Sequence, residues 1–319
     1  MKKVLFTIFM PFILFSCVSQ KKINAEKNIL TLKDSYCKPP ENYNYEQLKI
    51  SYNSDSIINA NAELKNYFSD QSILILNALG TTSEVDNMIK IKNDTTINSR
   101  LRILELKNII NNKITIVSTE LNATAAEYDC EGERVDQMAN YVQNINDKKN
   151  NFLVMSSIIT GAATSIAGGI IKNNDWQNAV GIGGGIVGAG LGLATFNPKG
   201  KKIEFEHERN LLRDIWNEKL ETPNFPPFVW YMFTEKKFAN NEHGFSILQN
   251  TKQRWLKLNF NDDLNEANSS VVFSNGGKYT ASDLRNRAIM LNQMQSVVRT
   301  IFQNINYLLL DLDKLVLKK

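Results

Sequence analysis

Histidine and cysteine are scarce in this 319-residue chain, which has two of the first and three of the second. The stretch EFEHE places Glu204 and Glu208 beside His207, but a second histidine or cysteine at metal-ligand spacing is missing. We therefore interpret these glutamates as a solvated helix face and predict no metal site. No nucleophile motif, P-loop or zinc spacing occurs either, so the sequence predicts no catalytic residue and no cofactor.

A large excess of charge of one sign is also absent, because 37 lysines and arginines oppose 33 aspartates and glutamates. Without the first 16 residues, which include Lys2 and Lys3, 35 basic residues remain. No stripe of lysine or arginine stands out along the chain. This balance argues against a nucleic-acid partner.

The first 17 residues, MKKVLFTIFMPFILFSC, place two lysines before an uncharged apolar run that is too short to span a membrane. This arrangement is typical of an export signal. Leu14-Phe15-Ser16-Cys17 resembles the lipobox of bacterial lipoproteins, which implies that residues 1–16 are removed and that the thiol of Cys17 carries a diacylglyceryl group. Such a residue is a stable membrane anchor. The alternative is an ordinary secretory signal.

Residues 17–52 are polar and lack a sustained period, and Pro39-Pro40 would stop a helix, so we interpret them as a tether. The residues after Cys17, VSQKK, lack the acidic run that resembles a surface-export signal in some lipoproteins. The expected location is therefore the bacterial cell envelope, with the chain anchored to the outer membrane and facing the periplasm. Cys37 and Cys130 meet oxidising conditions there, and they either pair or remain two buried thiols.

Residues 53–150 have helical periodicity. A first helix is predicted from Ser54 to Leu79, closed by Gly80, and Thr81-x-x-Glu84 has the spacing of a capping box that starts the next. Along this next helix, which is predicted to be long, apolar residues recur in alternating steps of four and three, with a break expected near Gly132. The predicted seam consists of Ile103, Lys107, Ile110, Ile114, Val117, Leu121, Thr124, Tyr128, Glu131, Val135, Met138, Val142 and Ile145.

A second seam follows Thr280-x-x-Asp283, which has the spacing of a helix cap. Its heptad positions are Leu284, Leu291, Val298, Ile305 and Leu312. Long helices that bury these two stripes on one another would supply a sizeable core. The sequence therefore predicts a mainly α fold, an elongated bundle of coiled-coil-like helices.

Residues 151–198 contain two uncharged arms, 152–171 and 179–196, with lysines on both sides of the pair. As a helix, each arm is long enough to match the hydrocarbon core of a bilayer. Small residues recur at every fourth position, which is typical of helices whose backbones pack closely. These helix-packing positions are Ser157, Gly161, Ser165, Gly169, Gly184, Gly188 and Gly192. We predict a glycine-zipper hairpin that either spans a membrane or folds into the bundle.

The second arm also contains Gly183-x-Gly185-x-x-Gly188, the glycine spacing of dinucleotide-binding loops. Such a loop needs a strand before it, a helix after it and parallel strands beside it. KIEFE, which ends at Glu206, could supply one further strand, but no βαβ alternation follows. A dinucleotide-binding enzyme is therefore the least favoured function.

Residues 199–319 have shorter elements. Helices are predicted from Ile203 to Leu220 and from Phe245 to Leu258, and VVFSNGGKYT at 271–280 predicts a small β-hairpin. Between the two helices, NFPPFVWYMF contains the aromatic cluster Phe225–Phe233. We interpret this cluster as core, with a docking surface for a protein partner as the alternative.

Together these patterns predict a non-enzymatic lipoprotein with a structural or scaffolding role, in which a hairpin contacts the lipid membrane. Packing between hairpins would build homo-oligomers. The alternative is a pore-forming or membrane-disrupting effector, because a hydrophobic hairpin between long helices is similar in outline to the α-helical pore-forming toxins.

Overall fold

The computed structural model describes residues 37, 50–170, 187, 200–206, 209–239 and 244–317, with the side chains of 163–170 and 316–317 excepted. The chain divides into two compact units, residues 1–38 and 39–319, and every element below belongs to the second. That unit is mainly α-helical, and its described residues include one two-stranded antiparallel sheet. The predicted fold class is therefore confirmed.

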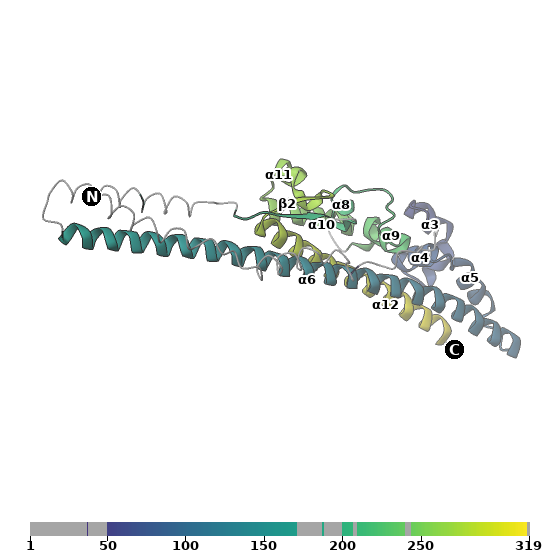
Figure 1. The fold of residues 1–319 in the computed structure, drawn as a ribbon. Coiled ribbons are helices and arrows are strands. Elements are labelled where there is room, and N and C mark those ends of the chain that lie inside the picture. The colour runs from purple at the N-terminus through teal and green to yellow at the C-terminus, as the bar shows by residue number, and fades with distance from the viewer. Residues whose placement is uncertain are drawn as a thin grey trace. The chain divides into compact units, whose positions relative to one another are not determined.

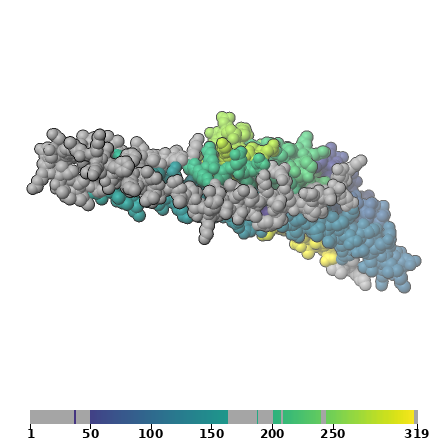
Figure 2. Space-filling model, viewed as in Figure 1, coloured from purple at the N-terminus to yellow at the C-terminus, as the bar shows by residue number. Residues whose placement is uncertain are grey.

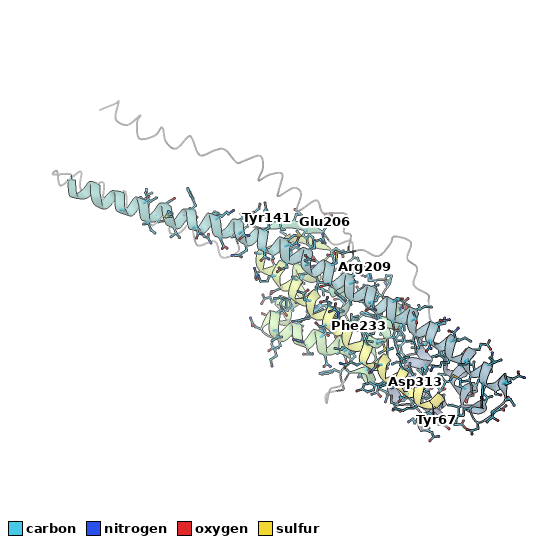
Figure 3. The ribbon with its side chains drawn as sticks, turned by 90° about the horizontal axis from the view of Figure 1, so that it is seen from below. Tyr67, Tyr141, Glu206, Arg209, Phe233 and Asp313 are labelled. Atoms are coloured by element: carbon cyan, nitrogen blue, oxygen red, sulfur yellow. The ribbon has the colours of Figure 1, made fainter. Side chains whose placement is uncertain are left out.

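Two long antiparallel helices run through this unit (Figure 1). They are α6 (Ile97–Ile170) and α12 (Ala281–Leu317). At 1.5 Å per residue, the 74 residues of α6 extend about 110 Å. Lys107, near the start of α6, forms an ion pair of 2.9 Å with Asp313, near the end of α12. Arg285, near the start of α12, donates to Asn140, much further along α6. Figure 3 likewise shows Asp313 and Tyr141 far apart along the pair.

Burial confirms the seams that were predicted on both helices. All thirteen seam positions between Ile103 and Ile145 are buried or half-buried, and none is exposed. The five heptad positions of α12, from Leu284 to Leu312, are at most 3% exposed. Each large apolar side chain buried in this way contributes about 1.5–3 kcal/mol to stability. The α6–α12 pair is therefore a major part of the core.

Helix α6 continues through Gly132, so the predicted break is wrong. A Cβ atom at position 132 would lie 2.5 Å from Oδ1 of Asn292 and 3.6 Å from Cβ of Leu291. Gly132 therefore marks a point where α12 approaches the backbone of α6 closely. The packing offsets the cost of glycine within a helix, which is about 1 kcal/mol relative to alanine.

The effect of a substitution at Gly132 on stability should depend on the size of the new side chain. Gly132→Ala is expected to change the free energy of unfolding by less than about 1 kcal/mol, because the Asn292 amide can rotate away and alanine favours the helix. Gly132→Leu should lower it by about 1–3 kcal/mol, because the longer side chain meets Leu291. Urea unfolding followed by circular dichroism measures both. Equal stability of Gly132→Leu and the wild type would contradict this close approach.

Three short helices replace the single helix that was predicted from Ser54 to Leu79. They are α3 (Ser54–Ala60), η2 (Ala62–Asn66) and α4 (Asp70–Ala78), and α5 (Thr82–Ile91) follows them. The side chain of Ser69 accepts a hydrogen bond from the N–H of Ser72 at 3.1 Å and so starts α4 separately. Gly80 closes α4 as predicted, with φ of +67° and a 2.9 Å bond from the Thr81 N–H to the Leu76 carbonyl.

One of the two predicted helix caps is present. At α12, the Asp283 N–H donates to Thr280 Oγ1 at 3.2 Å, and the Thr280 N–H donates to Asp283 Oδ2 at 2.8 Å. The long helix that was predicted to start at Thr81 begins only at Ile97, because the separate helix α5 ends at Ile91. At the start of α5, the Thr81 hydroxyl donates instead to the Leu76 carbonyl at the end of α4. Thr81 serves the end of one helix, and its hydroxyl does not cap the next.

The sheet joins two segments that are distant in sequence. β1 (Ile203–Glu206) pairs with β2 (Gly276–Tyr279), with Ile203 opposite Tyr279. The helix that was predicted over 203–220 is therefore wrong at its start, because buried Ile203 and Phe205 alternate with exposed glutamates in the period of a strand. Glu204 consequently lies on a solvated strand face and not on a helix face.

The β-hairpin that was predicted within 271–280 is also wrong. Its first arm is the 3₁₀ helix η4 (Val271–Phe273), and its second arm, β2, has β1 as its partner. Gly276 and Gly277 adopt φ values of +137° and +150°, and a Cβ atom at Gly276 would collide with the backbone of β1. The two glycines therefore allow the backbone of β1 to approach closely, and they do not form a local turn.

The remaining short helices lie on one side of α6, as the green segments of Figure 2 show. They are α8 (Leu211–Trp216), α9 (Pro227–Thr234), η3 (Lys236–Phe238), α10 (Ile247–Phe260) and α11 (Leu264–Ser269). Helix α10 confirms the prediction for 245–258, with a capping box between Ser246 and Gln249. The aromatic side chains of Phe225–Phe233 are at most 2% exposed, which confirms the core interpretation and leaves them no surface for a partner.

Candidate functional site

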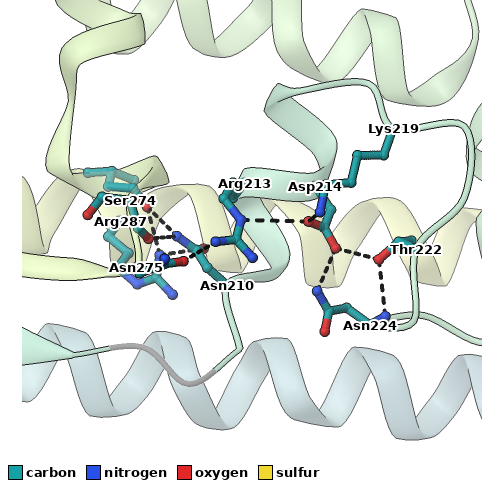
Figure 4. A network of polar contacts seen from close by, with 10 residues as sticks. Asn210, Arg213, Asp214, Lys219, Thr222, Asn224, Ser274, Asn275 and Arg287 are labelled. Atoms are coloured by element: carbon teal, nitrogen blue, oxygen red, sulfur yellow. Dashed lines mark hydrogen bonds and ion pairs between the residues drawn. The ribbon is translucent and has the colours of Figure 1, made fainter.

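A buried polar network connects α8, η4 and α12 (Figure 4). Asn210, which precedes α8 and is 1% exposed, donates to the carbonyls of Val272 at 2.9 Å and Ser274 at 2.7 Å. Its own carbonyl oxygen accepts from Arg287 of α12 at 3.0 Å. Arg287 also donates to the Val272 carbonyl at 3.1 Å. One asparagine therefore holds a loop, a short helix and the long helix together.

Arg287 carries a charge into the interior, because it is 2% exposed. Burial lowers its pKa from the ordinary value, while Tyr279 and Glu131 act in the opposite direction. Its Nε has no hydrogen-bond partner among the residues that the structure describes. A buried guanidinium is costly unless it is well hydrogen-bonded, so its two bonds to Asn210 and Val272 are important for stability.

Asp214 of α8 is the second centre of this network, and its side chain is fully buried. It forms an ion pair of 2.8 Å with Lys219, and it accepts hydrogen bonds from the amide of Asn224 at 2.6 Å and from the Thr222 hydroxyl. Burial raises the pKa of Asp214, but these three donors together outweigh burial and hold it below its ordinary value. The carboxylate thereby fixes the loop that follows α8. Its donors come from that loop, which indicates a structural role.

A titratable pair lies where α6 passes this region. The carboxylate of Glu127 on α6 lies 3.4 Å from the guanidinium of Arg209, and the two side chains are 11% and 17% exposed. Burial raises the pKa of Glu127 to about 7; Arg209 opposes this shift and Glu131 adds to it. The neighbouring Tyr128 hydroxyl is buried without a hydrogen-bond partner in the described part of the chain. Glu127 can therefore gain or lose a proton near neutral pH.

The described part of the first predicted arm is apolar and exposed. Its large side chains are between 48% and 65% exposed, and they are Phe152, Val154, Met155, Ile158 and Ile159. Because one residue of a helix advances about 100°, these five side chains occupy one side of α6. The half-buried side consists mainly of small hydroxyl residues, and its members are Leu153, Ser156, Ser157 and Thr160. Large apolar exposed surface of this kind marks a site that contacts lipid or protein.

The chain returns to α6 just before this apolar segment begins. The backbone N–H of Lys201 donates to Oδ1 of Asn146 at 2.8 Å, although the two residues are 55 positions apart. Gly200 has φ of +57°, and a Cβ atom there would collide with the Asn146 amide. Asn146 therefore holds together the two ends of the segment that contains both predicted arms.

A surface cavity of about 830 Å³ lies at this point. Residues from α6, from the approach to β1 and from the start of α12 line it. Its basic members are Lys149, Lys201 and Lys202, and its acidic members are Glu266 and Asp283. The sequence showed lysines on both sides of the apolar arms, and the structure brings three of them into one cavity.

The predicted site residues divide into those that the structure describes and those that it does not. Ser157 and Gly161 lie on α6, where the hydroxyl of Ser157 donates to the Leu153 carbonyl at 3.1 Å. Ser165 and Gly169 belong to the same helix, but their side chains are outside the description. The remaining positions, Cys17, Gly184, Gly188 and Gly192, fall outside the described residues. Cys37 and Cys130 are both disulfide-bonded.

Of the helices in the described ranges, none has the length and apolar character needed to cross a membrane. The second predicted arm, 179–196, lies outside these ranges apart from the helical residue Val187. The described residues contain no group of three or more histidine, cysteine, aspartate or glutamate side chains that could hold a metal. His207 and His243 are not among them. The glycines of the dinucleotide-like spacing are also outside, and β1, which a dinucleotide-binding site would need as a parallel strand, is antiparallel to β2.

Comparisons with protein-family models, with curated proteins and with solved structures find no match for this chain.

Proposed function

We propose that this chain is a non-enzymatic structural lipoprotein of the bacterial cell envelope, anchored through Cys17, whose long helix α6 carries an apolar segment to a membrane. The body formed by α6, α12 and the short helices serves as the scaffold, and the segment after Asn146 makes the lipid contact. The lipobox-like signal supports the anchor.

The observation that carries the proposal is the exposure of the apolar side of α6. Phe152, Met155 and Ile159 are between 62% and 65% exposed, whereas the seam residues of the same helix before Asn146 are buried or half-buried. Exposed apolar surface costs about 25 cal/mol per Å² until it is covered. A membrane covers such a surface over the whole length of a helix segment.

Vesicle binding by the full chain with Cys17→Ala tests this function without the lipid anchor. Adding Ile158→Asp and Ile159→Asp should weaken co-sedimentation with phospholipid vesicles at least tenfold, because a carboxylate at a lipid-facing position costs about 2.5–3.5 kcal/mol. The two positions are both 62% exposed, so the folded body should be unaffected. Circular dichroism checks that the helical content is unchanged.

The matched control is Ile109→Asp with Ile116→Asp on the same helix. These isoleucines are also exposed, at 38% and 43%, but they lie on the packed part of α6, far from the apolar segment. This control should bind vesicles like its parent. Equal binding by all three proteins, or no binding by the parent, would exclude membrane contact through α6.

A further inference from the structure

Two stretches of chain meet at the base of the apolar segment, and both carry lysines. Lys149 lies on α6, and Lys201 and Lys202 lie on the returning chain that Asn146 holds in place. Lys149 and Lys202 are exposed, and Lys201 is half-buried. The three share a single cavity of about 830 Å³.

Neither acidic side chain of this cavity forms an ion pair with Lys149 or Lys202. The carboxylate of Asp283 accepts hydrogen bonds from the backbone and the hydroxyl of Thr280, at 2.8 and 2.7 Å, and so caps α12. Glu266 is exposed in the first turn of α11. None of the ion pairs found among the described residues joins Lys149 or Lys202 to a carboxylate. The three lysines outnumber the two carboxylates of the lining, and Lys149 and Lys202 present their charge to solvent.

The spacing of Lys149 and Phe152 along α6 matches the distance between the head groups and the acyl chains of a membrane. Phe152, the first exposed apolar residue, follows Lys149 by three residues, which is about 5 Å along a helix. Apolar groups at a membrane interface insert about 5–10 Å below the level of the head groups. Lysines at the cavity would therefore lie at head-group level when Phe152 enters the acyl chains, and their long side chains can reach the phosphates.

We propose that Lys149 and Lys202 form a collar that binds the head groups of anionic phospholipids where α6 meets the membrane. This inference rests on the proposed function, since it assumes that the apolar segment contacts lipid, and it adds a preference for one lipid class. The partner is a negatively charged bilayer surface, which complements the charge of the collar and continues the apolar surface of α6.

Vesicles of phosphatidylcholine alone and of phosphatidylcholine with one third phosphatidylglycerol test the collar, again with the full chain carrying Cys17→Ala. The parent should bind the anionic vesicles at least tenfold more tightly at about 0.1 M salt, and the difference should shrink at about 0.5 M salt. Lys149→Gln with Lys202→Gln should lower binding to anionic vesicles about tenfold and leave binding to neutral vesicles unchanged. Both lysines are exposed, so the variant should fold.

The matched control is Lys236→Gln with Lys257→Gln, which removes the same charge from exposed positions on η3 and α10. It should bind both kinds of vesicle like the parent. Equal binding of the parent to both kinds, or equal loss in the two double variants, overturns the collar while the proposed function stands. Failure of the parent to bind either kind overturns both.

Discussion

An Asn210→Ala variant is expected to lose about 4 kcal/mol of its free energy of unfolding. The substitution removes two hydrogen bonds to carbonyls and one from the buried charge of Arg287, which keeps only its bond to Val272. An ordinary hydrogen bond contributes about 1 kcal/mol and one to a charged group about 1.5–3 kcal/mol, and a buried charge with fewer partners adds to the loss. Urea unfolding followed by tryptophan fluorescence measures the change.

Asn275→Ala is the matched control for Asn210→Ala. Asn275 accepts from Arg213 in the same region, but it is exposed, so water can replace it and the cost should stay below about 1 kcal/mol. A loss of equal size in both variants would mean that the effect of Asn210 does not come from its buried bonds. A small loss in Asn210→Ala would show that Arg287 finds another partner.

The second large effect concerns pH. The pKa of Glu127 is about 7 in the folded chain against an ordinary value of 4.5, so the folded state holds a proton between these values that the unfolded state has released. The contribution of Glu127 to the free energy of unfolding is therefore greatest below pH 4.5. It falls as the pH rises from 4.5 to 7, and it is constant above pH 7. At about 1.4 kcal/mol per pH unit, the total loss is about 3 kcal/mol. Urea unfolding at pH 5 and pH 8 measures it.

Glu127→Gln isolates this contribution, because glutamine resembles the protonated carboxyl and does not titrate. The variant should match the wild type near pH 5 and exceed it by about 2–3 kcal/mol at pH 8, even though Arg209 loses its ion-pair partner. Glu133→Gln, on an exposed face of the same helix, should retain the wild-type slope. A wild-type stability that does not change between pH 5 and pH 8 would contradict the shifted pKa.

Both predictions concern the region that guides the chain back to α6. Asn210 and Arg209 follow β1 closely, and β1 begins just after Lys202 of the collar. Loss of the network should therefore loosen the return of the chain as well as the core. In the absence of urea, an Asn210→Ala protein that still folds should then prefer anionic over neutral vesicles less strongly than its parent does.

The long helices were predictable because their pattern repeats over many turns. A repeat of Leu284, Leu291 and Val298 with flanking apolar residues can be buried only against another such stripe, and the buried seam of α6 supplies it. The short elements were not predictable in the same way. IEFE fits a helix or a strand when read alone, and the partner that makes it a strand lies more than 70 residues away, at β2.

The sequence alone also could not reveal the polar sites. Glu127 and Arg287 flank the apolar seams, where charged residues are usually solvated. The only sign in the sequence that Glu127 is buried is that it directly precedes Tyr128, a buried residue of the seam. Their burial follows from the loops of residues 209–224 and 271–275, which cover these parts of the long helices. Local spacing says nothing about which loop covers which face.

What the sequence by itself determined is the part of the protein that depends on periodicity: the pairing stripes, the cap of α12 and the apolar run after Lys149. Periodicity sets which side chains need to be buried, because the hydrophobic effect depends on the area removed from water and needs no particular partner. The tertiary structure decided the strand pairing, the buried charges and the meeting of the lysines at Asn146. Those features depend on directional hydrogen bonds between residues far apart in sequence, and only the folded chain brings them within reach.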